Sequence, residues 1–183
     1  MGKSLSLIIV VLLVGLSLPG SAYSQIQRKG WAFGFQVGAA QLRDKNFLST
    51  LDSTTGGYVG FNLGWSFNPD FVLLGEAETT LSREDVKSSS PYVFTNFVGV
   101  VSEYAVLNNL YFRLGPGMSS TFASYKGFKT RYGFGMLTEL GWDCWHQTDK
   151  ALDIHLKALP QWYETEHGGF AYMLGGGLGF TWY

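Results

Sequence analysis

Large apolar residues alternate with small or polar ones along most of the chain after residue 24, and a period of two is the pattern of β-strands with two different faces. The alternation is clear from Trp31 to Ala40 and recurs near 59–67, 110–118, 132–143, 152–162 and 170–182. Two further segments, 71–82 and 93–105, alternate less cleanly. Glu76 and Glu78 orient the first, and the faces of the second stay open. We therefore predict eight strands of about 10–13 residues, a length that crosses a bilayer when tilted by about 45°.

The connections between these segments alternate in length. Long connections are predicted at 42–56, 83–92 and 119–131 and a medium loop at 164–169, whereas the turns at 68–70, 108–109 and 146–150 are short. This order predicts an all-β fold, an eight-stranded antiparallel up-and-down transmembrane β-barrel with its long loops outside and its termini on the periplasmic side. Pro116 and Pro160 fall inside predicted strands, where proline cannot donate to the ladder, and we expect bulges at both.

The volume of a small barrel indicates which face points inward. Eight strands enclose a bore only just wide enough for side chains, so the glycine-rich face fits inside and the aromatic face does not. A soluble barrel of the lipocalin kind, with the apolar face inside, is the alternative. Six large aromatic residues near predicted strand ends favour the membrane barrel, since aromatic girdles mark both interfaces of such proteins; they are Trp31, Trp65, Phe67, Trp142, Trp162 and Trp182.

The composition agrees with a protein surface that is largely shielded from water. Charged residues make up 15% of the chain and aromatic residues 16%, whereas a soluble surface carries about 25–35% charge. The formal net charge of −1 gives neither the basic footprint of a nucleic-acid-binding protein nor an acidic tail. The single cysteine, Cys144, excludes an internal disulfide.

Residues 1–24 have the three-part layout of a secretory signal peptide. Lys3 is followed by an apolar run from Leu5 to Leu18, and Ala22 and Ser24 place small residues before a cleavage site. The run is shorter than the roughly 20 residues of a membrane-spanning helix, although a retained anchor is the alternative. We expect export, cleavage after Ser24, and a mature β-barrel domain of residues 25–183 in the cell outer membrane.

Four segments carry a likeness to a known family: GGYVGFNLGWSF, LYFRLGPGMSS, YGFGMLTELGW and the terminal YMLGGGLGFTWY. They resemble the small outer-membrane barrels of the OmpA-like and OmpX-like kind. The resemblance implies contact with outer-membrane lipid and lipopolysaccharide, and assembly by a barrel-assembly machinery that reads a terminal aromatic residue, here Tyr183. The apolar face of the last segment runs through Trp182, Phe180 and Leu178, one residue out of the usual register.

A search for chemistry finds no phosphate loop, zinc spacing or nucleophile elbow, and we expect no catalytic, cofactor-binding or metal-binding residues. His146 is expected as a solvated turn residue, His155 as a buried polar contact between Asp153 and Lys157, and His167 as a loop residue. Deacylase-type barrels place a serine two residues from a catalytic histidine, and none of these three histidines has one. A lipid A-modifying enzyme is the alternative class.

Four charged residues are predicted to face the bore at similar heights: Glu76, Arg113, Glu139 and Lys157. Isolated charges are costly in a narrow, poorly hydrated bore and paired ones are tolerated, so a salt-bridged plug is favoured over a narrow ion-conducting pore. We thus expect an integral outer-membrane barrel, a monomer without nucleic-acid partners, with a structural, surface-interaction or adhesive role.

Overall fold

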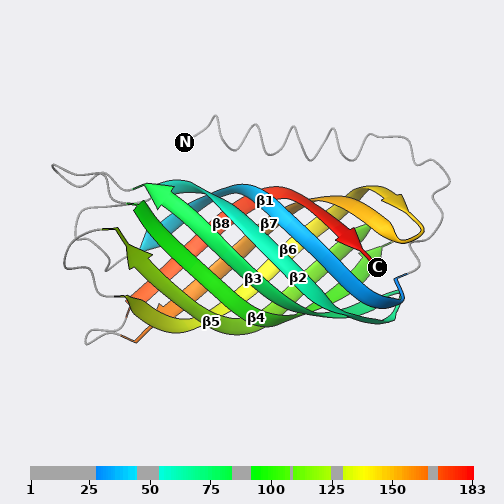
Figure 1. Ribbon diagram of the computed structural model, residues 1–183, viewed down its shortest axis with the longest axis horizontal. Helices are drawn as coiled ribbons and strands as arrows, with labels where there is room; N and C mark the ends of the chain where they lie inside the picture. The colour runs from blue at the N-terminus through cyan, green and yellow to red at the C-terminus, as the bar shows by residue number, and fades with distance from the viewer. Residues whose placement is uncertain (1–27, 45–53, 84–91, 108, 125–129, 165–168) are drawn as a thin grey trace.

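The computed structural model describes residues 28–44, 54–83, 92–107, 109–124, 130–164 and 169–183. Eight strands form a single closed sheet in which each strand pairs antiparallel with the next and β1 pairs with β8 (Figure 1). The strands are β1 (Gly30–Asp44), β2 (Thr54–Asn68), β3 (Phe71–Arg83), β4 (Tyr92–Leu107), β5 (Leu110–Ala123), β6 (Arg131–Gln147), β7 (Lys150–Tyr163) and β8 (Gly169–Trp182). The predicted eight-stranded antiparallel up-and-down barrel is confirmed.

The two ends of the barrel differ in their connections. Segments 69–70, 108–109 and 148–149 join strands at one end, here called the short-turn end, where β1 begins and β8 ends. Segments 45–53, 84–91, 124–130 and 164–168 join them at the opposite, long-loop end. The strands have 13 to 17 residues, and all except β3 are longer than the predicted 10–13. The difference lies mainly at the long-loop end, as in β5, where the outward Ser120 interrupts the apolar alternation after Met118 but the ladder continues to Ala123.

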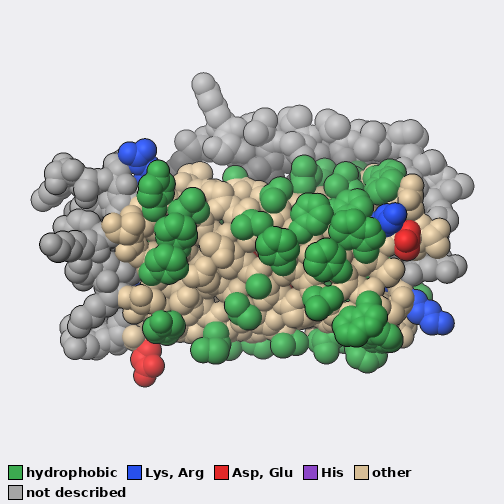
Figure 2. Space-filling model, viewed as in Figure 1, with side chains coloured by type: hydrophobic (Ala, Val, Ile, Leu, Met, Phe, Trp, Pro, Cys, Tyr) green, Lys and Arg blue, Asp and Glu red, His purple; other side chains and the backbone are tan. Residues whose placement is uncertain are grey.

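The outward face of the barrel is apolar over its whole girth, as the bore-volume argument predicts. Among the exposed residues are Trp31, Phe61, Leu63, Val98, Met118, Phe134, Leu156 and Leu178. In Figure 2, hydrophobic side chains cover the side of the barrel and the visible charged ones lie near its two ends. Aromatic contacts gather at both ends, with Trp31 against Trp65 at the short-turn end and Phe94 stacked on Phe122 at the long-loop end. No helix of the described ranges is long and apolar enough to cross a membrane.

The faces of β4, which the alternation alone leaves open, are resolved by burial. Val93, Thr95, Phe97, Val101 and Glu103 point into the barrel and are at most 3% exposed. The alternation is obscured because this strand places apolar residues on both faces and also carries Asn96 and Ser102 on the outward one.

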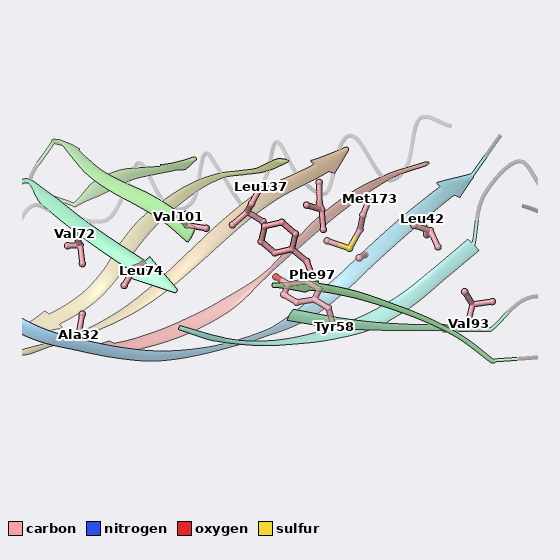
Figure 3. Close-up of a cluster of buried hydrophobic side chains, with 12 residues drawn as sticks. Ala32, Leu42, Tyr58, Val72, Leu74, Val93, Phe97, Val101, Leu137 and Met173 are labelled. Carbon is pink, nitrogen blue, oxygen red and sulfur yellow. The ribbon is translucent and has the colours of Figure 1, made fainter. Parts of the chain in front are cut away.

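Phe97 fills the middle of the bore and shows why the inward face needs glycine (Figure 3). A Cβ at Gly99 or at Gly117 would lie 2.5 Å from the Phe97 ring, and one at Gly135 would lie 3.2 Å from it. Three glycines on the adjacent strands β4, β5 and β6 therefore form the seat of one aromatic ring. Leu137, Leu159 and Met173 are buried in the same cluster.

The bulges predicted at the two prolines are wrong. The register of β4 with β5 is the same on both sides of Pro116, and that of β6 with β7 is the same on both sides of Pro160. Each proline keeps a partner on one neighbouring strand, Met136 for Pro116 and Tyr172 for Pro160, and pairing lapses on the other side. A missing N–H thus interrupts one ladder locally without inserting a residue.

The register shifts occur beside the short turns instead. Each adds one residue at the end of a strand: Phe67 in β2, Val106 in β4 and Cys144 in β6. A bulge increases the local twist, and the one at Cys144, three residues before the end of β6, turns Trp145 outward after the inward Asp143.

Candidate functional site: the charged lumen

The four charged residues predicted to share the bore lie together in it. They come from β3, β5, β6 and β7, and each is at most 3% exposed. Arg113 Nη1 lies 3.0 Å from Glu139 Oε1, and Lys157 Nζ lies 3.4 Å from Glu139 Oε2 and 3.8 Å from Glu76 Oε1. Glu139 is the centre of the group because it contacts both cations.

Neutral side chains complete the surroundings of Glu139. Gln36 Nε2 donates to both carboxylate oxygens at 3.1 and 3.2 Å, and the Tyr111 hydroxyl donates to Oε1 at 3.1 Å. Lys157 in turn donates to Gln36 Oε1 at 2.7 Å and forms a short contact with Glu78. A buried charge surrounded by hydrogen bonds and opposite charges is tolerated, whereas the same charge without them is not.

The network continues toward the short-turn end through Glu103. Arg113 donates to Glu103 Oε2 through Nε at 2.7 Å, and its Nη2 lies 2.6 Å from the same oxygen as an ion-pair contact, so two guanidinium nitrogens face one carboxylate oxygen. Arg28, which precedes β1, enters the same end and lies 3.0 Å from Glu103 and 2.9 Å from Asp143. The connected chain of charges therefore runs Arg28, Glu103, Arg113, Glu139, Lys157 and Glu78.

Both ends of the described chain meet at Arg28. Its guanidinium lies 5.1 Å from the centre of the Tyr183 ring, and the Tyr183 hydroxyl donates to Glu103 Oε1 at 3.2 Å. Burial alone would lower the pKa of Arg28, but its interactions with Tyr183, Glu103 and Asp143 raise that pKa above its ordinary value, so the side chain is a permanent cation. We call Arg28, Glu103, Asp143 and Tyr183 the terminal latch.

The latch gives a physical reason for the unusual register of the last strand. Trp182 and Phe180 point outward, and Trp182 is 37% exposed. Tyr183 therefore falls on the inward phase of the alternation, where its hydroxyl reaches the lumen carboxylate of Glu103.

A second polar group contains His155. Its Nδ1 lies 2.7 Å from Asp153 Oδ1 and its Nε2 lies 2.5 Å from the Tyr58 hydroxyl. The arrangement resembles the acid–histidine–hydroxyl relay of nucleophilic catalysts, but all three side chains are at most 4% exposed. His155 is thus a buried polar contact, held by Asp153 on its own strand and by Tyr58 from across the bore. His146 lies at the end of β6, half-buried, rather than in the turn, and His167 is outside the described residues.

Several members of the network were not among the four predicted residues. Glu78 and Asp143 fall on the predicted inward faces, so the two-residue alternation already indicates that their side chains point into the bore. Glu103 was hidden by the irregular alternation of 93–105. Arg28 lies before the first strand, outside any alternation, and carries no sequence signal for a position inside the bore.

The lumen carries more acid than base. Among the described residues the buried acidic residues are Glu76, Glu78, Glu103, Glu139, Asp143 and Asp153, and the buried lysine and arginine residues are Arg28, Arg113 and Lys157. In that same part of the chain no group of three or more His, Cys, Asp or Glu side chains is arranged to hold a metal ion. The geometry favours a bore that is filled by ion-paired and hydrogen-bonded side chains.

Comparisons with known proteins agree with this architecture. No model of a known protein family matches the chain, and no curated protein matches it. The solved structure of Neisserial surface protein A is similar with a TM-score of 0.55 and 17% identity, over 82% of this chain and 97% of that one. This chain has the fold of the small outer-membrane β-barrels. The barrel fold is likewise that of Ail, the attachment invasion locus protein of Yersinia pestis, with a TM-score of 0.50 and 17% identity, over 82% of this chain and 99% of that one.

Proposed function

We propose that this chain is an integral outer-membrane barrel with a filled lumen, and that it acts as a structural or surface-interaction protein through its long-loop end. The observation that carries the proposal is that the closed sheet has an apolar outer face and a charged inner face, the reverse of a soluble protein. The outward face is apolar, and charged residues that a soluble protein would expose are buried inside. A closed sheet also satisfies its backbone hydrogen bonds internally, as hydrocarbon requires.

The proposed sidedness follows from the connections. Small outer-membrane barrels place short turns in the periplasm and longer loops outside. The short-turn end would then hold the terminal latch in the periplasm, and segments 45–53, 84–91, 124–130 and 164–168 would face the exterior. The name of Ail, an attachment protein with the same fold, supports an adhesive role as one form of surface interaction.

A narrow cation-conducting pore is the second candidate, because the acidic excess of the lumen would favour cations. Several features oppose it. The ion pairs cross the bore from Glu103 to Glu78, Phe97 occupies its middle, and Arg28 lies in the short-turn end. An enzyme acting on lipid A is the third candidate, and the only histidine relay of the described residues is shielded inside the bore rather than facing lipid.

Planar lipid bilayers test the filled lumen. We expect no stable single-channel currents from the reconstituted full-length protein, with a trimeric porin in the same bilayers as the positive control. Stable cation-selective currents would overturn the filled lumen in favour of the pore. Mass spectrometry of lipid A from cells with and without the protein tests the third candidate, and a change in acylation dependent on the protein would contradict a non-enzymatic role.

A further inference from the structure

A polar cluster lies on the outward face of the barrel, where every neighbouring row is apolar. Thr79 on β3, Asn96 on β4 and Ser120 on β5 are directly paired across the sheet and form one row. The Thr79 hydroxyl donates to Asn96 Oδ1 at 2.9 Å, and Asn96 Nδ2 donates to Ser120 Oγ at 3.3 Å. All three side chains are half-buried.

The rows on either side place this cluster inside the apolar belt. The row toward the long-loop end contains Leu81, Phe94 and Phe122, and the row toward the middle contains Ala77, Val98 and Met118. Two residues along a strand tilted by about 45° correspond to a depth of about 5 Å. The cluster therefore lies about 5 Å from the Phe94–Phe122 stack along the barrel axis. In the proposed membrane placement such an aromatic stack marks the interface, and the cluster falls where lipid acyl chains join their headgroup.

The hydrogen bonds within the cluster do not use all of its N–H and O–H donors. An amide nitrogen carries two hydrogens and a hydroxyl carries one. Thr79 uses its hydrogen on Asn96, whereas the second Nδ2 hydrogen of Asn96 and the hydroxyl hydrogen of Ser120 have no acceptor among the contacts of the described residues. Polar groups within a membrane belt are costly without partners and commonly mark functional sites.

The chemistry of an occupant follows from these two donors. We propose that the Thr79–Asn96–Ser120 cluster binds an acyl carbonyl of lipopolysaccharide, an ester or amide oxygen at the base of its acyl chains. A second copy of this chain is the alternative occupant, because Asn96 and Ser120 also carry acceptor oxygens and could pair with their own symmetry mates, and the cross-linking experiment below distinguishes it. The proposal rests on the proposed function, since that function places the long-loop end, and with it the cluster, in the outer leaflet.

Native mass spectrometry of the detergent-solubilised full-length protein, titrated with purified lipid A, tests the site. We expect Asn96→Leu and Ser120→Ala each to weaken lipid A binding about fivefold, the equivalent of one lost hydrogen bond. Ser102→Val is the matched control, because Ser102 also faces outward from β4 but lies closer to the short-turn end. It should bind lipid A as the parent does.

The alternatives give distinct results. Unchanged lipid A binding by both cluster variants would overturn the site. Equal weakening toward phosphatidylethanolamine would overturn its preference for lipopolysaccharide. A cross-linked dimer that Asn96→Leu abolishes would assign the cluster to self-association instead. Each variant is first checked for the heat-dependent mobility shift of a folded barrel. If the parent itself lacked that shift, the proposed function would fail, which is distinguishable from failure of the site.

Discussion

Arg113 shows how a single side chain can organise the interior of a narrow barrel. It is 1% exposed, it holds Glu103 through two nitrogens, and it reaches Glu139 with the third. It therefore joins the terminal latch to the group around Lys157. Replacing a whole buried network with apolar residues can be neutral, but removing one member leaves its partners charged and buried.

Arg113→Ala should lower the free energy of unfolding by about 3–5 kcal/mol, because Glu103 and Glu139 lose a buried partner. Urea titration of the protein in lipid vesicles, followed by tryptophan fluorescence, measures this change. Adding Glu139→Ala should recover part of the loss, and the double-mutant cycle gives the coupling. Arg43→Ala is the matched control, since Arg43 is exposed and donates to the Tyr172 hydroxyl at the rim, and it should cost under about 1 kcal/mol. A negligible coupling free energy between Arg113 and Glu139 would contradict a bore that is filled by mutually stabilising ion pairs.

Each strand is built to present two environments at once. In β5, Leu114 is 42% exposed on the outward face while its neighbour Arg113 is buried in the lumen. The same division in β7 exposes Leu156 at 43% beside buried His155 and Lys157. A shift of one residue in register would exchange these environments along the whole strand, so the alternation fixes the register strongly.

Leu114→Arg and Leu156→Arg should each destabilise the barrel by about 2–4 kcal/mol in lipid vesicles, because each would place a cation in the middle of the apolar belt. Thr55→Arg, an outward substitution near the long-loop end of β2, should cost no more than about 1 kcal/mol. The same urea titration measures all three. If the two leucine variants unfolded like the parent, the outward face would not be the lipid-facing one.

At the scale of the whole molecule, the features that the sequence can predict are those that depend on the alternation of apolar with small or polar residues along each strand. Alternation with a period of two is a property of neighbouring residues, so the strands, the faces of all of them except β4, and the inward position of Glu139 follow from the sequence alone. The seat of Phe97 does not, because Gly99, Gly117 and Gly135 come together only when three strands pair in one register. Arg28 likewise depends on closure, since Glu103 and Asp143 reach it from β4 and β6. Apolar alternation also underestimates strand length, because a polar outward residue such as Ser120 interrupts the pattern while the ladder continues beyond it.

The central claim is that this barrel spans the outer membrane with its long-loop end outside, and thiol labelling of intact cells tests it most directly. Cysteine is placed at Ser124 on the long-loop side or at Asp70 in a short turn, both exposed, in a Cys144→Ser background. An impermeant thiol reagent should label Ser124→Cys on intact cells and Asp70→Cys only after permeabilisation. Labelling of Asp70→Cys but not Ser124→Cys on intact cells would invert the orientation, and labelling of neither until lysis would contradict placement in the outer membrane.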